Sequence, residues 1–390
     1  MNIALNEEQV MMAETARQIG KKFGLDYWRD LDARKQFPKE LWQAICDAGF
    51  CGVALPEEYG GAGLGMLDMV IIIEALSASG GGCTLGQLFM LNPIFGGVSV
   101  SKFGTEAQKR ELLPQLIKGE INFCMALTEP DAGSNSLSIK TFAARDGEGW
   151  RLNGQKTWIT AVPQARKMLV VARTKKAEEV KRRTEGISMF IIDADRQGIE
   201  HTPIEKLGTN TLPSSVVYFE DVRIEPDELI GTLHNGWYEL LDVLNTERIV
   251  TTAGLVGTGE LAIRLAVDYA KERCVFGKTP IAAYQGLQFP LAHAHAELEC
   301  ARVMNRYAAG LCDSGKPYGT EANIAKLIAA QSATAATDRA IQTMGGMGYA
   351  KEYHVERLSR DARLFRIAPV SEEMILNFIA TSILGMPRSY

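Results

Sequence analysis

The chain has 390 residues, of which 46% are hydrophobic and 23% are charged. This balance is typical of a soluble globular protein, and the length requires two or three subdomains rather than one ordinary core. The net charge is −5, from 42 Lys and Arg against 47 Asp and Glu, and this weakly acidic balance argues against a nucleic-acid partner, whose phosphates would require a basic face.

The sequence also argues against a membrane protein, an exported protein and a metalloprotein. The N-terminus shows neither a signal peptide nor a transit peptide, and the most apolar run, residues 69–73, is far too short to span a bilayer. Seven scattered cysteines without a CxxC pair indicate reduced thiols. His293 and His295, two apart on a predicted helix, point to different sides and form no metal site. We therefore expect a cytoplasmic protein without a bound metal.

Residues 1–121 are predicted to form a helical N-terminal domain. Apolar positions recur there at a spacing of three to four residues, for example at Leu41, Ile45 and Ala48. Asn6, followed by two glutamates, is a typical helix start. Residues 56–63 are rich in Gly and Pro and are predicted to form a loop.

Residues 122–234 are predicted to form a middle β domain. The runs 167–173, 186–192 and 215–219 are rich in β-forming residues and are bounded by Gly, Pro and Asp. Within residues 150–158, Asn153 and Gly154 stand between two alternating segments, a pattern that predicts a hairpin turn at that point.

Residues 235–390 are predicted to form a C-terminal helical domain, with long helices over 240–273, 282–310 and 320–343. Residues 254–259 contain three glycines and invite comparison with a dinucleotide-binding loop. No strand precedes them and they lie inside a helical pattern, so we interpret them as small residues that allow close helix packing.

Two segments of the β domain carry polar and aromatic groups suited to a flat ligand. Residues 127–135 are rich in turn formers and contain the hydroxyls of Thr128 and Ser134, which can bind carbonyl or ring-nitrogen acceptors. Trp158 stands two residues before the hydroxyl of Thr160, an arrangement that suits a heteroaromatic ligand. The alternatives are a purely structural turn and a core tryptophan.

Two further segments lie at predicted helix ends. Residues 273–278 end a long helix with cations, which could also simply complement the helix dipole. Residues 342–349 end another helix with a glycine pair, which could cap the helix or allow backbone amides to approach a phosphate.

Taken together and in this order, these segments resemble the acyl-CoA dehydrogenase family over essentially the whole chain. The motifs are Thr-Glu-Pro-x-Ala-Gly-Ser at 128–134, Trp-Ile-Thr at 158–160, Arg-x-x-Phe-Gly-Lys at 273–278 and Gln-x-x-Gly-Gly at 342–346. The resemblance implies a mostly α fold with an N-terminal helical domain, a β-barrel-like middle domain and a C-terminal four-helix bundle. It also implies an FAD cofactor between the middle domain and the C-terminal helices, in a homo-oligomer that is usually a tetramer.

The resemblance further assigns residues to the cofactor and the substrate. The isoalloxazine ring would be flanked by Met125, Leu127, Thr128, Gly133, Ser134, Trp158, Ile159 and Thr160. The diphosphate and adenine side would be held across a dimer by Arg273, Phe276 and Gln285, and a neighbouring subunit's FAD by Gln342, Gly345 and Gly346. Ser371 and Glu373 would also face the flavin, while Ser134, Asn245 and Arg248 would contact the acyl-CoA.

Removal of the weakly acidic α-proton of a thioester requires a base, and a glutamate kept out of water suits this role. The position at which many family members carry this glutamate is Pro369 here, which cannot accept a proton. Glu247 follows Leu240, Val243 and Leu244 at helical spacing, which places it on an apolar stripe where an unpaired carboxylate is costly.

Glu247 also matches the base position of the isovaleryl-CoA and long-chain branches. We therefore predict that Glu247 is the catalytic base. One alternative is a helix-surface glutamate paired with Arg248 or with a nearby lysine. Another places the base at Glu372 or Glu373, which follow Ser371 at a predicted helix start.

The resemblance thus implies FAD-dependent α,β-dehydrogenation of an acyl-CoA, with flavin N5 as hydride acceptor and electron-transferring flavoprotein as electron acceptor. Two alternatives stay open. One is an enoyl-CoA reductase of the same family, and the other is a flavin- or CoA-binding homologue without redox turnover, which the substitution at Pro369 motivates.

Overall fold

The computed structural model describes residues 5–389, and its first helix begins where the sequence predicts. The Asn6 side chain caps this helix by accepting a hydrogen bond from the Gln9 N–H at 2.8 Å. The N-terminal helices are α1 (Glu7–Arg34), α2 (Lys39–Asp47), α3 (Met66–Leu76), α4 (Cys83–Phe89), α5 (Ser99–Phe103) and α6 (Glu106–Ile117). Two π-helical segments, Ser77–Gly81 and Met90–Val98, flank α4.

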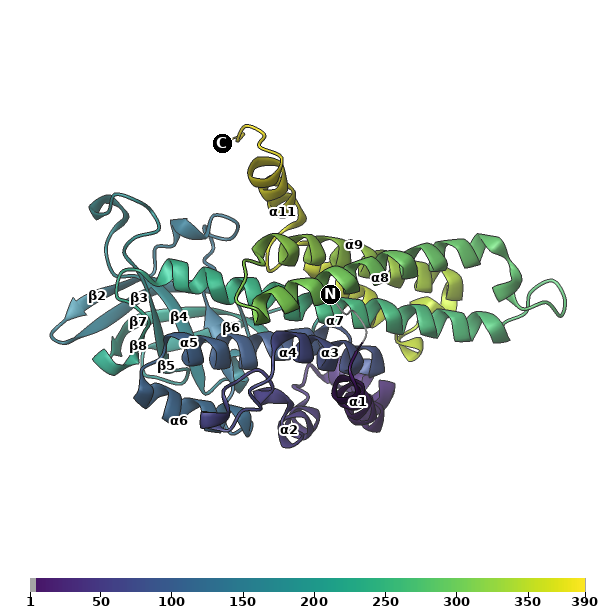
Figure 1. The fold of residues 1–390 in the computed structure, drawn as a ribbon, viewed down its shortest axis with the longest axis horizontal. Helices are drawn as coiled ribbons and strands as arrows, with labels where there is room; N and C mark the ends of the chain where they lie inside the picture. The colour runs from purple at the N-terminus through teal and green to yellow at the C-terminus, as the bar shows by residue number, and fades with distance from the viewer. Residues whose placement is uncertain (1–4, 390) are drawn as a thin grey trace.

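The middle of the chain forms one eight-stranded sheet, shown at the left of Figure 1. The strands are β1 (Phe123–Ala126), β2 (Phe142–Asp146), β3 (Gly149–Thr160), β4 (Lys167–Arg173), β5 (Ile187–Asp193), β6 (Ile199–Ile204), β7 (Ser214–Ile224) and β8 (Leu229–Ile230). Their order is β6-β7-β3-β2-β4-β5-β8, and β1 pairs with β4 in parallel.

The predicted hairpin turn at Asn153 and Gly154 is wrong. Both residues lie inside the continuous strand β3, where the pairing with β7 shifts register between Leu152 and Gly154. The true turn precedes β3, where Gly147 adopts a left-handed φ of 60° between β2 and β3. The Asn-Gly pair therefore serves a β-bulge rather than a chain reversal.

Long helices return after the sheet and form the elongated bundle at the right of Figure 1. They are α7 (Gly236–Glu272), α8 (Gln285–Asp313), α9 (Gly319–Met344), α10 (Val355–Arg363) and α11 (Glu372–Phe378). The glycine-rich residues 254–259 lie within α7, as predicted. An added Cβ on Gly254 would come within 3.1 Å of the Cα of Gly86 in α4, so these glycines allow close helix contact.

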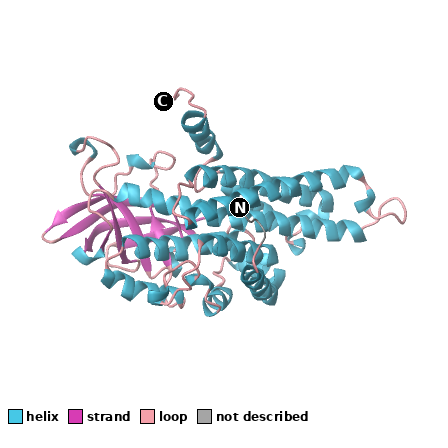
Figure 2. Ribbon diagram, viewed as in Figure 1, coloured by secondary structure: helices cyan, strands magenta, loops and turns pink. Residues whose placement is uncertain are grey.

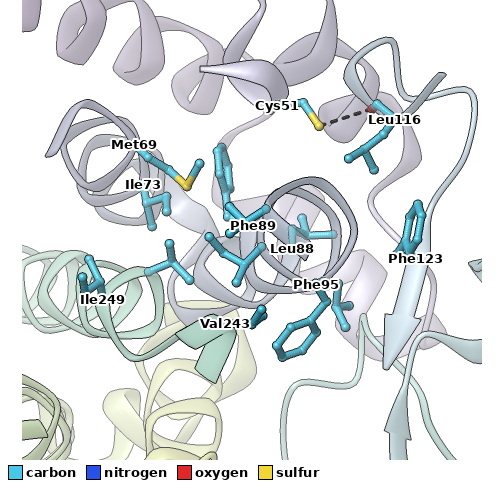
Figure 3. Packing of buried hydrophobic residues seen from close by; sticks show 14 of the residues in the cluster. Cys51, Met69, Ile73, Leu88, Phe89, Phe95, Leu116, Phe123, Val243 and Ile249 are labelled. Carbon is cyan, nitrogen blue, oxygen red and sulfur yellow. Dashed lines mark hydrogen bonds between the residues drawn. The ribbon is translucent and has the colours of Figure 1, made fainter. Parts of the chain in front are cut away.

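Figure 2 confirms the predicted class, a mostly helical chain with a β region in its middle. The core joins the parts, because Val243 and Ile249 of α7 pack in the same buried cluster as Leu88 and Phe89 of α4 (Figure 3). Two stretches, Cys83–Phe103 and Gly236–Glu272, are long and apolar enough to cross a membrane, but 100% and 78% of their apolar windows are already buried inside the protein.

Candidate functional site

The structure brings the loop after β1 next to strand β3. The Thr157 N–H donates a hydrogen bond to the Thr128 carbonyl at 2.9 Å, so the loop lies beside Trp158. Trp158 is 55% exposed and has a left-handed φ of 60°. It is not a core tryptophan, because its ring is held at the surface by an uncommon backbone conformation.

The other residues predicted to surround the flavin lie at different depths around this loop. Met125, Thr128 and Thr160 are half-buried, Leu127 and Ile159 are buried, and Gly133 and Ser134 are exposed. The buried members anchor the loop to the sheet, and the exposed members leave hydroxyl and backbone groups accessible.

The remaining predicted cofactor residues before residue 350 lie far from this loop within one chain. Arg273, Phe276 and Gln285 are exposed at the turn between α7 and α8, at the end of the bundle opposite the sheet (Figure 1). Gln342, Gly345 and Gly346 are exposed at the end of α9, where Met344 packs with residues of the second half of α7. A single chain therefore does not bring the two groups of residues together.

Glu247 is the central polar feature of α7. Its side chain is only 4% exposed, and its carboxylate forms no hydrogen bond or ion pair within residues 5–389. Burial raises its pKa to about 7, while the charges of Arg248 and Lys326 oppose the rise. The alternative of a surface glutamate paired with Arg248 or a nearby lysine is wrong. Glu247 is buried, Arg248 Nη1 donates to Asn245 Oδ1 at 2.5 Å, and Lys326 Nζ donates to backbone carbonyls.

A groove of about 380 Å³ opens beside the first turns of α7. It is lined by Lys102, Asp242, Asn245, Cys312, Gly315, Lys316, Pro317, Tyr318 and Gly319. Asn245 connects it to Arg248, which is nearly buried and whose Nε has no hydrogen-bond partner within the described residues. The groove thus leads from solvent to the turn of α7 that carries Glu247.

The buried Lys326 of α9 forms hydrogen bonds to the segment around Pro369. Its Nζ donates to the carbonyls of Phe365 and Val370, each at 2.5 Å. Burial lowers the pKa of Lys326 to about 8, although nearby Glu372 and Glu247 counteract this shift. Lys326 therefore both fixes this segment and places a cation near Glu247.

The second candidate pair for the base has other roles in the structure. Glu372 is buried and forms a bidentate salt bridge with Arg366, at 2.6 and 2.8 Å, which holds the pKa of its carboxyl below the ordinary value. Glu373 is exposed at the start of α11. Ser371 caps this helix by accepting from the Met374 N–H. Among these acidic residues only Glu247 is both buried and unpaired.

Three family models of acyl-CoA dehydrogenase match consecutive parts of the chain. The N-terminal domain matches residues 6–120, the middle domain residues 124–222 and the C-terminal domain residues 234–384. The acyl-CoA dehydrogenase FadE12 of Mycobacterium tuberculosis is 41% identical over 387 residues, covering 99% of this chain and 98% of that protein. The chain belongs to the acyl-CoA dehydrogenase family.

Other members of the acyl-CoA dehydrogenase family are similar over the same length. A 3-(aryl)acrylate reductase of Clostridium sporogenes is 33% identical, covering 97% of this chain and 99% of that protein. The structure of a glutaryl-coenzyme A dehydrogenase in complex with glutaryl-CoA has a TM-score of 0.94 at 29% identity, covering 100% of this chain and 98% of that one. This acyl-CoA dehydrogenase family member is therefore an oxidoreductase.

Sequence reasoning missed a buried ion pair beneath the loop of this family member. Lys156 Nζ donates to Glu129 Oε1 at 2.9 Å and to the Leu127 carbonyl at 2.8 Å. Glu129 also accepts from the backbone N–H groups of Lys140 and Thr141. Although burial opposes it, these partners hold the pKa of Glu129 below its ordinary value, while burial lowers the pKa of Lys156 to about 8. The pair fixes the loop from behind.

Lys326 was also missed, although its sequence context contained a signal. It stands in the run Ile-Ala-Lys-Leu-Ile-Ala-Ala, where a single cation interrupts an apolar stretch of a predicted helix. A lysine at such a position is fully buried only when partners satisfy its charge.

Proposed function

We propose that the protein removes one hydrogen from the α carbon and one from the β carbon of an acyl-CoA thioester, with Glu247 as the base. The observation that carries this proposal is the buried, unpaired carboxylate of Glu247, in the same turn of α7 as Asn245, which lines the groove. In the reaction the Cα–H proton moves to this carboxylate, the β hydrogen leaves as hydride, and a Cα=Cβ double bond forms.

The environment of Glu247 suits proton transfer near neutral pH. A base works best when its pKa lies near the operating pH, and burial raises the pKa of Glu247 to about 7. The positive charges of Lys326 and Arg248 limit the rise in the pKa of Glu247. The two cations therefore tune the base and leave its oxygens free to contact substrate.

The cofactor is FAD, and the exposed residues of this chain fit it. Trp158 offers a flat ring at the surface beside the hydroxyls of Thr128 and Thr160. At the end of the helical bundle far from the sheet, Phe276 is fully exposed, and nothing lies within 4 Å of a Cβ added to Gly345 or Gly346. We expect these residues to hold the isoalloxazine and the adenine side, respectively. Bound FAD supplies the acceptor for the β hydride.

The groove beside α7 suits the coenzyme A end of the substrate. Lys102 and Lys316 line it, and Lys102 Nζ is paired at 2.6 Å with Asp242, another lining residue, so Lys316 supplies the positive charge for phosphate groups. Asn245 and Arg248 continue its polar lining inward. We expect Ser134 to contact the substrate from the middle domain. The thioester would then enter with its acyl group pointing toward Glu247.

Two partners complete the proposal. Because the predicted cofactor residues lie at opposite ends of one chain, a complete FAD site requires a second copy, and we propose a homotetramer (Figure 1). We propose electron-transferring flavoprotein as the electron acceptor.

The test is anaerobic mixing of the FAD-loaded protein with a panel of saturated and α,β-unsaturated CoA esters. We expect a saturated ester to bleach the flavin absorbance, and Glu247→Gln to slow this step by about 10²- to 10⁴-fold while still binding the ester. No bleaching by any saturated ester, or comparable rates in Glu247→Gln, would overturn the proposal.

The second candidate function is reduction of an α,β-unsaturated substrate, which is favoured by the similarity to the 3-(aryl)acrylate reductase. The same atoms serve both directions. In this case the chemically reduced protein is reoxidised by an unsaturated ester, and saturated esters leave the oxidised flavin unchanged. Glu247 would then donate the α proton, so Glu247→Gln slows this reaction as well.

A further inference from the structure

Thr251 differs from the other threonines of α7. Thr246, Thr252 and Thr258 each donate their hydroxyl to a carbonyl three or four residues earlier in the helix, at 2.7 Å. Thr251 is only 1% exposed, yet its Oγ1 has no hydrogen-bond partner within residues 5–389. Buried hydroxyls are normally paired, so this one is available to a ligand.

Thr251 lies next to the proposed base. It follows Glu247 by four residues, and side chains at this spacing are neighbours on one face of a helix. Proceeding along α7 from the groove, one meets Asn245, then Glu247 and then Thr251. Thr251 is therefore about 6 Å, slightly more than one helical turn, further along α7 from the groove than the base.

Gln87 of α4 provides a second unpaired buried polar atom, one residue from the point where α4 meets Thr251. Its side chain is 5% exposed, and its Oε1 has no partner within the described residues. The neighbouring Gly86 faces α7, because a Cβ added to it would lie 3.0 Å from the Val250 carbonyl and 3.5 Å from the Thr251 Cα. Helix α4 thus crosses α7 directly at Thr251.

The direction of the Gln87 side chain follows from its neighbours on α4. Thr84, three residues earlier, lies 3.4 Å from the hydroxyl of Thr211 in the middle domain. Residues three apart share a helix face, so Gln87 lies between the side that meets the middle domain and the side that meets α7. Its side chain therefore lies on the flank of α4 that adjoins the crossing with α7, where Gly86 approaches Thr251.

The surroundings make these two polar groups conspicuous. Leu88, Val243 and Val250 nearby are fully buried apolar residues, and Figure 3 shows Leu88 and Val243 in this cluster. A valine and a leucine would fill the positions of Thr251 and Gln87 without leaving unsatisfied polar atoms. The cost of keeping them is recovered when a ligand supplies the missing hydrogen bonds.

We propose that the acyl group of the substrate carries a hydroxyl about one helical turn beyond its α carbon, bound between Gln87 and Thr251. A hydroxyl fits both groups, since it donates to the amide oxygen of Gln87 and accepts from the hydroxyl of Thr251. The inference rests on the proposed function in one respect, that the acyl chain passes Glu247. It names the substrate class as hydroxylated acyl-CoA thioesters.

The test measures affinity without chemistry. S-(6-hydroxyhexyl)-CoA and S-heptyl-CoA are matched thioethers that differ by a hydroxyl in place of a methyl group, and without a carbonyl they have no acidic α-proton. Their dissociation constants for the FAD-loaded protein are compared by calorimetry in the wild type, in Thr251→Val and in Gln87→Leu. Thr252→Val is the control, because its hydroxyl is already bonded within the helix.

We expect the wild type and the control to bind the hydroxylated thioether about fivefold more tightly. The preference should disappear or reverse in Thr251→Val and in Gln87→Leu. Equal affinities in the wild type, a preference that survives both substitutions, or no binding of either thioether would overturn the inference. Because the measurement needs no turnover, a preference that depends on both residues supports it even where saturated thioesters fail to bleach the flavin and the proposed function fails.

Discussion

Replacement of the proposed base should make the protein more stable at alkaline pH while greatly slowing its reaction. In Glu247→Gln a group that is costly to ionise is replaced by a neutral one of the same shape. Burial raises the pKa of Glu247 from its ordinary value of 4.5 to about 7. Between these two pH values the folded protein keeps a proton that the unfolded chain has already released.

The sign and size of the effect follow from this difference. As the pH rises from about 4.5 to 7, the wild type loses stability, and the loss is complete above pH 7. A difference of this size corresponds to about 3 kcal/mol in the free energy of unfolding. For 390 residues this equals an upward shift of about 4 °C in Tm for Glu247→Gln at pH 8. Near pH 4.5 the two proteins should melt together.

The assay is calorimetric melting of both proteins from pH 5 to 8, beside Glu111→Gln as a control. Glu111 is an exposed residue of α6, so its substitution makes the same chemical change without burial. A Glu247→Gln variant that melts below the wild type at pH 8, or a difference that does not grow with pH, would refute the argument that Glu247 is a desolvated, unpaired carboxylate.

Other substitutions test the supporting contacts. Lys326→Met should lower Tm and shift the pH profile of turnover to higher pH. The positive charge of Lys326 lowers the pKa of Glu247, so removing that charge raises the pKa; an unchanged profile would contradict this. Glu129→Gln should cost about 3 to 5 kcal/mol and reduce FAD retention, measured by flavin absorbance, since it leaves Lys156 buried without its partner. Adding Lys156→Met should restore most of the stability, and failure to do so would show that the pair is not the cause. Gly86→Ala should cost about 1 to 3 kcal/mol in chemical denaturation, because its Cβ would press on α7; a neutral result would show that α4 can shift freely.

Much of the fold could be predicted because its elements have clear local patterns. The run 167–173 is strand β4 from end to end, since it is a continuous β-forming segment buried on both faces. The hairpin at Asn153 and Gly154 was mispredicted because a β-bulge uses the same residues as a turn. Gly154 has φ of 148° and Asn153 accepts from the backbone N–H of Asp221, a partner on a strand that the local sequence does not reveal.

The candidate site was predictable only where one helix carries the information. The spacing of Leu240, Val243 and Leu244 before Glu247 predicted a buried carboxylate, and the structure has one. Lys326 and Gln87 reach the same region from other helices, so no spacing along the chain could reveal them. Whether Thr251 bonds within its own helix is likewise settled by tertiary packing, because its sequence context resembles that of Thr252.

The length of α7 has a genetic consequence. Glu247 lies inside α7 and Arg273 is the C-cap of the same helix, 26 positions or about 39 Å further along. The two residues therefore serve different cofactors if each site is shared between two chains. Glu247→Gln and Arg273→Ala should each inactivate a homo-oligomer. Coexpressed, the two inactive polypeptides should complement one another, because a mixed pair combines the intact Glu247 of one chain with the intact Arg273 of the other at one of its two sites. Recovered activity in such hybrids, and none when the two substitutions are in the same chain, would show that the two ends of α7 contribute to FAD sites shared with a neighbouring chain.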